Sequence, residues 1–314
     1  MPDHYSKIAP SNLTVRFWGV RGSIPSPGPE TVRYGGNTSC VELRLGNEVL
    51  ILDAGSGIRQ LGLHLAEEFR EQDLRTTLLI SHTHWDHIQG LPFFGPAYSR
   101  GSQFRVLSAP GTGVKLRAAL VSQMDPIQFP IPLGCLTGIG GIEEFAAATA
   151  SVGSFRVSTI ELNHPGGCSG FRIEAGGCSI AYLPDHESYH GAMVSSDPAV
   201  ARTAAEAQVA LVSFLAGCDL LILDAQYDRT EYPAHVGWGH GCLDDSVALA
   251  LRAKAESLVL FHHDPQHDDL QIDAMVEEAR AQVAEAGGRL MVQAARERSQ
   301  IVLTAEAREK KWAA

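Results

Sequence analysis

The first half of the chain contains short segments that alternate hydrophobic and polar residues or form brief apolar runs, as β-strands do. We predict three strands, at residues 13–18, 38–45 and 49–53. The turn residues Gly46-Asn47 between the last two predict a hairpin. Residues 56–70 carry hydrophobic side chains at helical spacing, and the apolar run at residues 76–81 predicts a buried strand.

The second half repeats this order of strands followed by alternating helices and strands. Residues 124–141 are rich in Pro and Gly and poor in charge, which predicts a long loop of the kind that often covers an active site. After it we predict strands at residues 155–162, 170–174, 179–183, 220–223 and 258–261. Helical patterns occupy residues 199–215, 243–253 and 270–286. The pattern predicts an α/β fold with two sheets packed face to face and helices outside.

The chain shows no repeat, low-complexity tract or long hydrophilic linker, so we predict a single domain over residues 1–314. Hydrophobic residues make up 45% and charged residues 19%, which is typical of globular proteins. No apolar stretch approaches the ~20 residues that span a bilayer. Residues 1–12 lack the apolar core of a secretory signal, which makes a cytoplasmic location the expectation. The six cysteines include no C-x-x-C pair.

The formal net charge of -11 argues against binding of long nucleic acid, which requires clustered Lys and Arg. Residues 118–155 contain neither Lys nor Arg. A local basic pocket for one or two phosphates remains compatible with this composition. The expected partner is therefore a small molecule, with no membrane contact, and a homodimer is compatible with the sequence.

Three histidines and an aspartate follow the predicted strand at residues 76–81, in the motif His82-Thr83-His84-Trp85-Asp86-His87. Such groups are costly to bury unpaired, so their density at one strand end indicates a bound cation. Alternate residues of an extended segment face one way, so His82 and His84 can bind one metal, and a turn can bring Asp86 and His87 to a second. The alternative is a polar surface turn that happens to be rich in histidine.

Further candidate ligands follow other predicted strands: His164, Asp185 and the pair His262-His263. Each alone is more typical of a turn or of a satisfied polar group. Together they supply enough nitrogen and oxygen donors for two divalent ions, which suits zinc and also manganese or iron.

The motif His82-x-His84-x-Asp86-His87, with the later ligands, resembles the metallo-β-lactamase superfamily over nearly the whole chain. The resemblance implies an αββα sandwich of two mixed β-sheets. It also implies that His82, His84 and His164 bind one metal, that Asp86, His87 and His262 bind the other, and that Asp185 bridges them. The distance from the strand favours His262 over His263. Asp53 resembles a position near the metals, where it would hold a loop or a ligand histidine through hydrogen bonds.

Other residues narrow the implied reaction. Oxidoreductase members carry a carboxylate where this chain has Trp85, and many β-lactamases replace or lack the aspartate that Asp185 retains. Asp224 and His240, before an apolar helix, resemble the ribonuclease Z-like branch, in which an acidic residue orients a histidine that protonates the leaving oxygen. The family usually has Ser-Thr after this histidine, and here Gly241-Cys242 follow. The alternative is that His240 starts a helix and Asp224 lies in a turn.

The N-terminal motifs at residues 17–25 and 34–40 resemble small phosphodiesterases of the same branch, including those that act on cyclic nucleotides or cyclic ribose phosphates. Arg21 could contact a phosphate, or the glycines could simply shape a tight loop beside the metals.

We therefore hypothesise a dinuclear metal-dependent phosphodiesterase for small or cyclic nucleotides, with water between the metals as the nucleophile. Asp86, Asp185, His240 and Asp224 are the predicted catalytic residues. The alternatives are a thioester or lactone hydrolase and a non-catalytic metal or nucleotide sensor.

Overall fold

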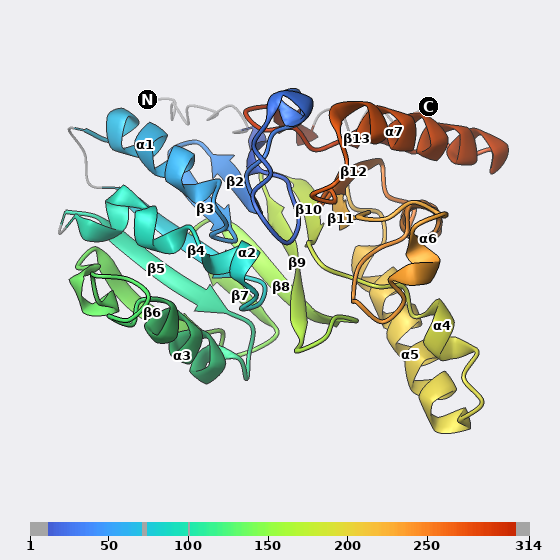
Figure 1. Ribbon diagram of the computed structural model, residues 1–314, viewed down its shortest axis with the longest axis horizontal. Coiled ribbons are helices and arrows are strands. Elements are labelled where there is room, and N and C mark those ends of the chain that lie inside the picture. Colours follow the sequence, from blue (N-terminus) through green and yellow to red (C-terminus); the bar gives the residue numbers. More distant parts are fainter. Residues whose placement is uncertain (1–11, 71–73, 100, 306–314) are drawn as a thin grey trace, which may run out of the picture.

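Two β-sheets packed face to face form the centre of the computed structural model, and helices cover their outer faces (Figure 1). The structure describes residues 12–70, 74–99 and 101–305. Of residues 1–12, where the sequence shows no secretory signal, all but residue 12 lie outside the described residues. The arrangement confirms the predicted αββα sandwich of two mixed sheets.

The first sheet has the strand order β14-β1-β2-β3-β4-β5-β6. Strands β14, β1, β2 and β3 pair antiparallel, and β3 to β6 pair parallel. The bounds are β1 Leu13–Gly19, β2 Cys40–Leu45, β3 Glu48–Leu52, β4 Arg75–Ile80, β5 Gln103–Ser108, β6 Ile139–Glu144 and β14 Gln300–Leu303.

The second sheet has the order β13-β12-β11-β10-β9-β8-β7. Strands β10 to β13 pair parallel and β7 to β10 antiparallel. The bounds are β7 Thr149–Val152, β8 Phe155–Leu162, β9 Cys168–Ala175, β10 Cys178–Leu183, β11 Leu220–Asp224, β12 Ser257–Phe261 and β13 Met291–Ala294. Alternate residues of both sheets, such as Phe17 and Tyr182, fill the core between them.

Helices α1 and α3 pack on the first sheet, and α5, α6 and α7 pack on the second (Figure 1). The α-helices are α1 Ile58–Glu68, α2 Trp85–Ile88, α3 Gly113–Gln123, α4 His190–Met193, α5 Pro198–Leu215, α6 Leu243–Arg252 and α7 Asp269–Glu285. The 3-10 helices are η1 Pro29–Thr31, η2 Leu91–Phe93, η3 Gly95–Tyr98, η4 Leu133–Cys135 and η5 Tyr232–Ala234. None of the described helices is long and apolar enough to cross a membrane.

Each strand and helix predicted from the sequence is present, with bounds shifted by a few residues at most. The predicted loop at residues 124–141 is wrong at its end, because residues 139–141 begin β6. Gly140 and Gly141 weaken the strand signal in the sequence. Hydrogen bonding to β5 stabilises the strand in spite of this weak local preference. Elements β5, β7, β13, β14, α3 and α4 were not predicted.

Candidate metal centre

The first candidate ligands directly follow β4. His84 has an extended backbone, with φ of -65° and ψ of 153°, and immediately precedes the short helix α2. The helical turn therefore carries Asp86 and His87 to a different side from His82 and His84. Asp86 and His87 are buried, whereas Trp85 between His84 and Asp86 is 71% exposed.

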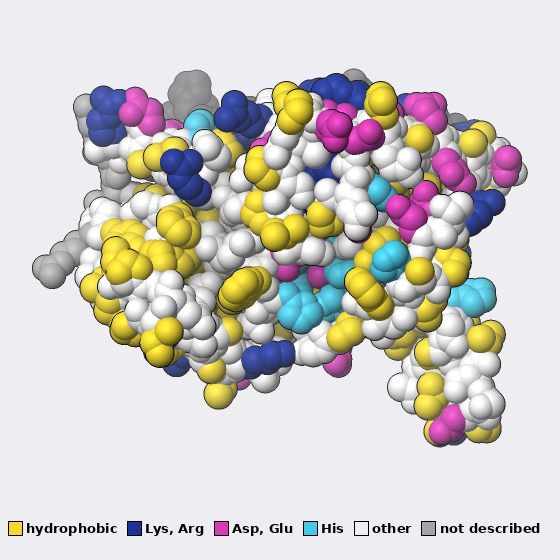
Figure 2. Space-filling model, viewed as in Figure 1, with side chains coloured by type: hydrophobic (Ala, Val, Ile, Leu, Met, Phe, Trp, Pro, Cys, Tyr) yellow, Lys and Arg dark blue, Asp and Glu magenta, His cyan; other side chains and the backbone are white. Residues whose placement is uncertain are grey.

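The structure brings the predicted ligands together in two groups, and within each group the ligand atoms lie within 4.8 Å of one another. One group is His82, His84, His164 and Asp185, and the other is Asp86, His87, Asp185 and His262. Asp185 belongs to both, as expected of a bridging ligand. Histidine side chains gather near the centre of the face shown in Figure 2, with acidic side chains beside them. The grouping is the one that the resemblance implied, and binding of metal by it stays a prediction.

His262, rather than His263, faces this cluster. His262 Nε2 lies 3.0 Å from Asp86 Oδ2, whereas His263 Nε2 donates to the carbonyl of Ala295 at 3.0 Å. Burial lowers the pKa of His263 to about 3, so this ring is a neutral donor to the backbone. His262 has a φ of 60°, a left-handed conformation that non-glycine residues rarely adopt and that is common at functional sites.

Neighbouring groups orient the imidazole rings from outside the cluster. His87 Nδ1 donates to Asp53 Oδ2 at 2.8 Å, and His164 Nδ1 donates to the Gly239 carbonyl at 2.9 Å. His262 Nδ1 donates to Gln226 Oε1 at 2.9 Å. In each ring this bond fixes the outer nitrogen, so the inner nitrogen faces the cluster. The inner nitrogens of His87 and His262 lie 3.0 Å from carboxylate oxygens of Asp185 and Asp86, where a metal ion would take the place of the proton between them.

Two buried atoms of the cluster, His82 Nε2 and Asp185 Oδ1, make no hydrogen bond among the described residues, although Asp185 Oδ1 has His87 Nε2 at 3.0 Å in an ion pair. Ser81 Oγ donates its only proton to Asp53 Oδ2, so His82 Nδ1 must donate to Ser81 Oγ at 3.1 Å. His82 Nε2 is therefore an unpaired acceptor. Unsatisfied buried acceptors are costly, and a cation between them removes that cost. The donor set thus fits divalent metal ions.

The charges of the cluster also favour a cation. Burial lowers the pKa of His82 well below its ordinary value, and the adjacent His87 adds to this effect, so His82 stays neutral. Burial alone would also lower the pKa of His87, but Asp185 and Asp86 raise it well above the ordinary value. A position that stabilises an imidazolium in this way also stabilises a metal ion, because both are positive charges beside the same carboxylates.

Asp224 and His240 form a hydrogen-bonded pair beside the cluster. His240 Nδ1 donates to Asp224 Oδ2 at 3.0 Å and lies 3.9 Å from Asp185 Oδ2. Burial opposes protonation of His240, but Asp224 raises its pKa to about 9. Asp224 also accepts the backbone amides of His186 and Gln226, so the pair belongs to a hydrogen-bonded network beside the cluster.

Glycines around His240 allow the chain to approach the cluster closely. A β-carbon at Gly241 would lie 2.3 Å from the Asp224 carbonyl oxygen, so the glycine that departs from the family pattern is needed for this packing. Gly239, with φ of 87°, would place a β-carbon 2.4 Å from His164 Nδ1. Its amide donates to Glu187 Oε2 at 2.8 Å, which fixes the carbonyl that His164 contacts.

The N-terminal loop after β1 lies against the cluster. The Arg21 guanidinium is buried and donates to the carbonyls of Gly35, Asp264 and His267, so it holds loops together. A β-carbon at Gly22 would lie 2.5 Å from the His262 ring. These contacts favour the loop-shaping interpretation over phosphate binding by Arg21.

Ser23 and Gln226 contribute to the cluster but were not identified from the sequence. The Ser23 amide donates to Asp86 Oδ2 at 2.8 Å, and Gln226 orients His262. Every residue but proline has a backbone amide, so the sequence does not mark the Ser23 contact. Gln226 and His262 are 36 positions apart in the chain, so their contact depends on the fold. Only the folded structure shows these partners.

Comparison with known proteins places this geometry in a family. The model of the beta-lactamase superfamily domain matches residues 48–263, which include every candidate ligand. The chain belongs to the β-lactamase superfamily. It is 24% identical over 281 residues to a ribonuclease Z of Limosilactobacillus fermentum, covering 80% of this chain and 87% of that protein.

Two solved structures share the superfamily fold. The metallo-β-lactamase fold protein YhfI from Bacillus subtilis has a TM-score of 0.67 and 20% identity, over 93% of this chain and 100% of that one. A diphosphatase from the PhnP family has a TM-score of 0.62 and 18% identity, over 93% and 97% of the two chains. The family model shows the superfamily, and these two structures confirm its fold.

Asp53 supports the segment from Ser81 to His87 through hydrogen bonds. Its carboxylate accepts bonds from the Ser81 amide and hydroxyl, from His87 and from the Tyr182 hydroxyl, which confirms the predicted bond to a ligand histidine. In Asp53→Asn the side-chain NH2 group, which cannot accept a hydrogen bond, must face at least one of these donors. We expect the zinc affinity, measured by chelator competition, to fall about 10- to 100-fold.

The matched control for Asp53→Asn is Tyr182→Phe, which removes one bond and leaves Ser81 and His87 in place. It should lower the free energy of unfolding by about 1 kcal/mol in urea titration while leaving the zinc affinity within a few fold. Equal zinc affinities for Asp53→Asn and the unsubstituted chain would contradict the orienting role of Asp53.

Proposed function

We propose that this chain is a dinuclear metal-dependent hydrolase that cleaves a phosphodiester bond in a small or cyclic nucleotide, or in a cyclic ribose phosphate. The observation that carries the proposal is the Asp224–His240 pair, which lies beside both groups of candidate ligands. The relatives named as a ribonuclease and a diphosphatase support a phosphate-containing substrate.

The residues present would hold two divalent ions, one in each group, with Asp185 shared. Imidazole and carboxylate donors without a thiolate suit zinc, and manganese or iron as well. Bound ions would supply activated water and charge stabilisation for the phosphate oxygens. The role of the chain is to aim the inner nitrogens of His87, His164 and His262 at these ions, through the outer bonds of each ring.

His240 would protonate the leaving oxygen. Its Nδ1–H is fixed on Asp224, and its Nε2 has no partner among the described residues, so that nitrogen is available to a substrate. A sugar alkoxide is a poor leaving group and needs a proton, whereas a thiolate leaves near neutral pH without one. A general acid beside the metals therefore favours a phosphodiester of an alcohol over a thioester.

A substrate panel tests the proposal. The zinc-loaded chain should hydrolyse bis-p-nitrophenyl phosphate or a 3′,5′-cyclic nucleotide with a kcat/KM at least about 100-fold above that for an acyl-glutathione thioester. Chelation should remove the activity and added zinc should restore it. Faster thioester hydrolysis would identify the alternative hydrolase, full phosphodiesterase activity without metal would contradict the metal centre, and binding without product over hours would identify a sensor.

A further inference from the structure

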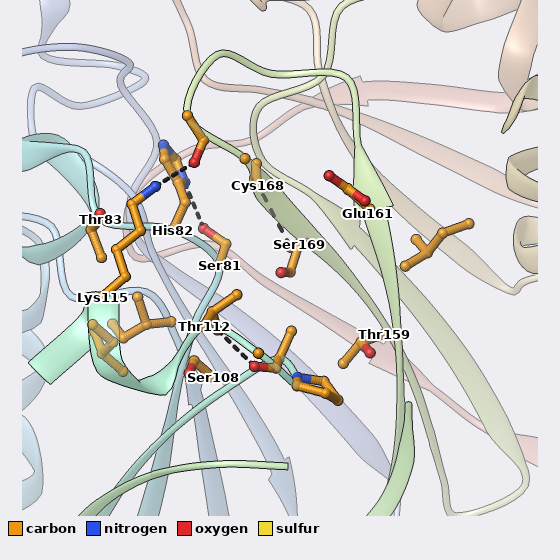
Figure 3. Close-up of a pocket in the computed structure, with 18 of the residues that line it drawn as sticks. Ser81, His82, Thr83, Ser108, Thr112, Lys115, Thr159, Glu161, Cys168 and Ser169 are labelled. Atoms are coloured by element: carbon orange, nitrogen blue, oxygen red, sulfur yellow. Dashed lines mark hydrogen bonds between the residues drawn. The ribbon is translucent and has the colours of Figure 1, made fainter. Parts of the chain in front are cut away.

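A cavity of about 440 Å³ opens beside the metal centre, between the first and second sheets (Figure 3). It lies at the carboxyl ends of β4 and β5, beside the first turn of α3, and is closed on the other side by β8 and the start of β9. His82 and Gly166 line one end of it, so the cavity reaches the first group of candidate ligands. Its volume is in the range of small-molecule sites.

Ser108, the last residue of β5, lines this cavity and carries an unsatisfied polar group. The residue is 3% exposed, and its Oγ has no hydrogen-bond partner among the described residues. A buried hydroxyl left without a partner costs about 1–3 kcal/mol. Ser108 is one of the residues that line the cavity (Figure 3), and rotation of its side chain about the Cα–Cβ bond would present this oxygen to a bound molecule.

Lys115 places a positive charge between the cavity and the metal centre. Its Nζ donates to the Gly166 carbonyl. A β-carbon built on Gly166 would lie 3.7 Å from both Lys115 Nζ and His84 Nε2, so the ammonium and this ligand ring flank the same residue. An anionic group held at the metals can therefore contact Lys115 as well, while the rest of the molecule extends into the cavity.

The walls of the cavity indicate the chemistry of the part of the bound molecule that extends into it. They are mainly apolar, with Ile80, Leu116 and Ile160 among them, and the polar groups include the hydroxyls of Thr112 and Thr159. Among its described lining residues Lys115 is the only cation, and Glu161 adds a carboxylate. A second phosphate group in the cavity would be repelled by the Glu161 carboxylate, and no second cation among the described lining residues would neutralise it. An uncharged ring with a few polar atoms at its edge fits both the apolar walls and the hydroxyls.

We propose that this cavity binds the nucleobase of a nucleotide substrate, with Ser108 Oγ hydrogen-bonded to the edge of the base and Lys115 in contact with the phosphate. This inference rests on the proposed function, because it takes the substrate to be a nucleotide. It adds the part of the substrate that lies away from the reacting bond and the residues that select it.

Binding of two non-hydrolysable probes to the zinc-loaded full chain tests this subsite. Adenosine 5′-monophosphate and ribose 5-phosphate carry the same phosphate and differ by the base. Isothermal titration should show at least about ten-fold tighter binding of the nucleotide. Ser108→Ala should weaken nucleotide binding about five-fold and leave ribose 5-phosphate binding unchanged.

Ala148 lines the cavity and is exposed, so Ala148→Trp should fill the base subsite and remove the preference for the nucleotide. Ala147→Trp is the matched control, because Ala147 is an exposed neighbour that does not line the cavity, and it should keep the preference. Equal affinity of the unsubstituted chain for the two probes, or an unchanged preference in Ala148→Trp, would overturn the subsite. A preference that both tests uphold in a chain with no phosphodiesterase activity would refute the proposed function alone.

Discussion

Asp185→Asn is expected to remove at least one metal ion per chain and to lower phosphodiesterase kcat/KM about 1,000-fold or more, because both groups of ligands share this carboxylate. Burial alone would raise the pKa of Asp185, but His262 and His87 hold it well below the ordinary value, so the residue is an anion in the folded chain. Asparagine keeps the shape and removes the charge. Mass spectrometry of bound metal and steady-state kinetics measure the two effects.

The control for Asp185→Asn is the same substitution at an exposed position. Asp125 accepts the Ile127 amide in a turn and belongs to neither group of candidate ligands. Asp125→Asn should therefore retain the metal content and the rate of the unsubstituted chain. Asp185→Asn with full metal content and undiminished activity would show that the bridging assignment is wrong.

The candidate ligands could be predicted because each follows an apolar strand whose end the sequence marks clearly. His82 follows β4, Asp185 follows β10 and His262 follows β12. Buried strands give strong signals, and polar residues capable of binding metal at their carboxyl ends stand out against them. The order of elements then fixed the two-sheet architecture, since strands that alternate with helices form parallel sheets.

Elements with weaker patterns could not be predicted in the same way. Helix α3 places Val114 and Val121 at exposed positions, 87% and 52% accessible, which blurs its helical period. Strands β13 and β14 are four residues long and lie at sheet edges, where half-exposed positions resemble loops. The cavity depends on α3 and β5, so it was not visible from the sequence either.

The metal centre joins the two sheets, and this explains why its outer contacts required the structure. His82 and His87 follow a strand of the first sheet, whereas Asp185 and His262 follow strands of the second. The hydrogen bond between Tyr182 and Asp53 crosses the same interface. The full set of candidate ligands is assembled only when the sheets are packed, so metal binding by this set would be linked to folding.

His240→Ala is expected to slow cleavage of a 3′,5′-cyclic nucleotide about 100- to 10,000-fold while leaving the metal content intact. The alkoxide that leaves such a substrate requires a proton, and the alanine variant has no group at this position to supply it. Asp224 would remain held by the amides of His186 and Gln226, so its position should not change. Kinetics and metal analysis of one preparation measure both quantities.

The choice of leaving group separates proton donation from a structural role of His240. Bis-p-nitrophenyl phosphate releases p-nitrophenolate, which is stable without a proton, so its hydrolysis should fall much less in His240→Ala than that of the cyclic nucleotide. A structural defect would slow both substrates alike. Loss of metal in His240→Ala would instead make this histidine a ligand, because its ring lies with Asp224 and His262 in a third group whose ligand atoms are within 4.8 Å. Retained metal with a loss that depends on the leaving group is the result that the Asp224–His240 geometry predicts.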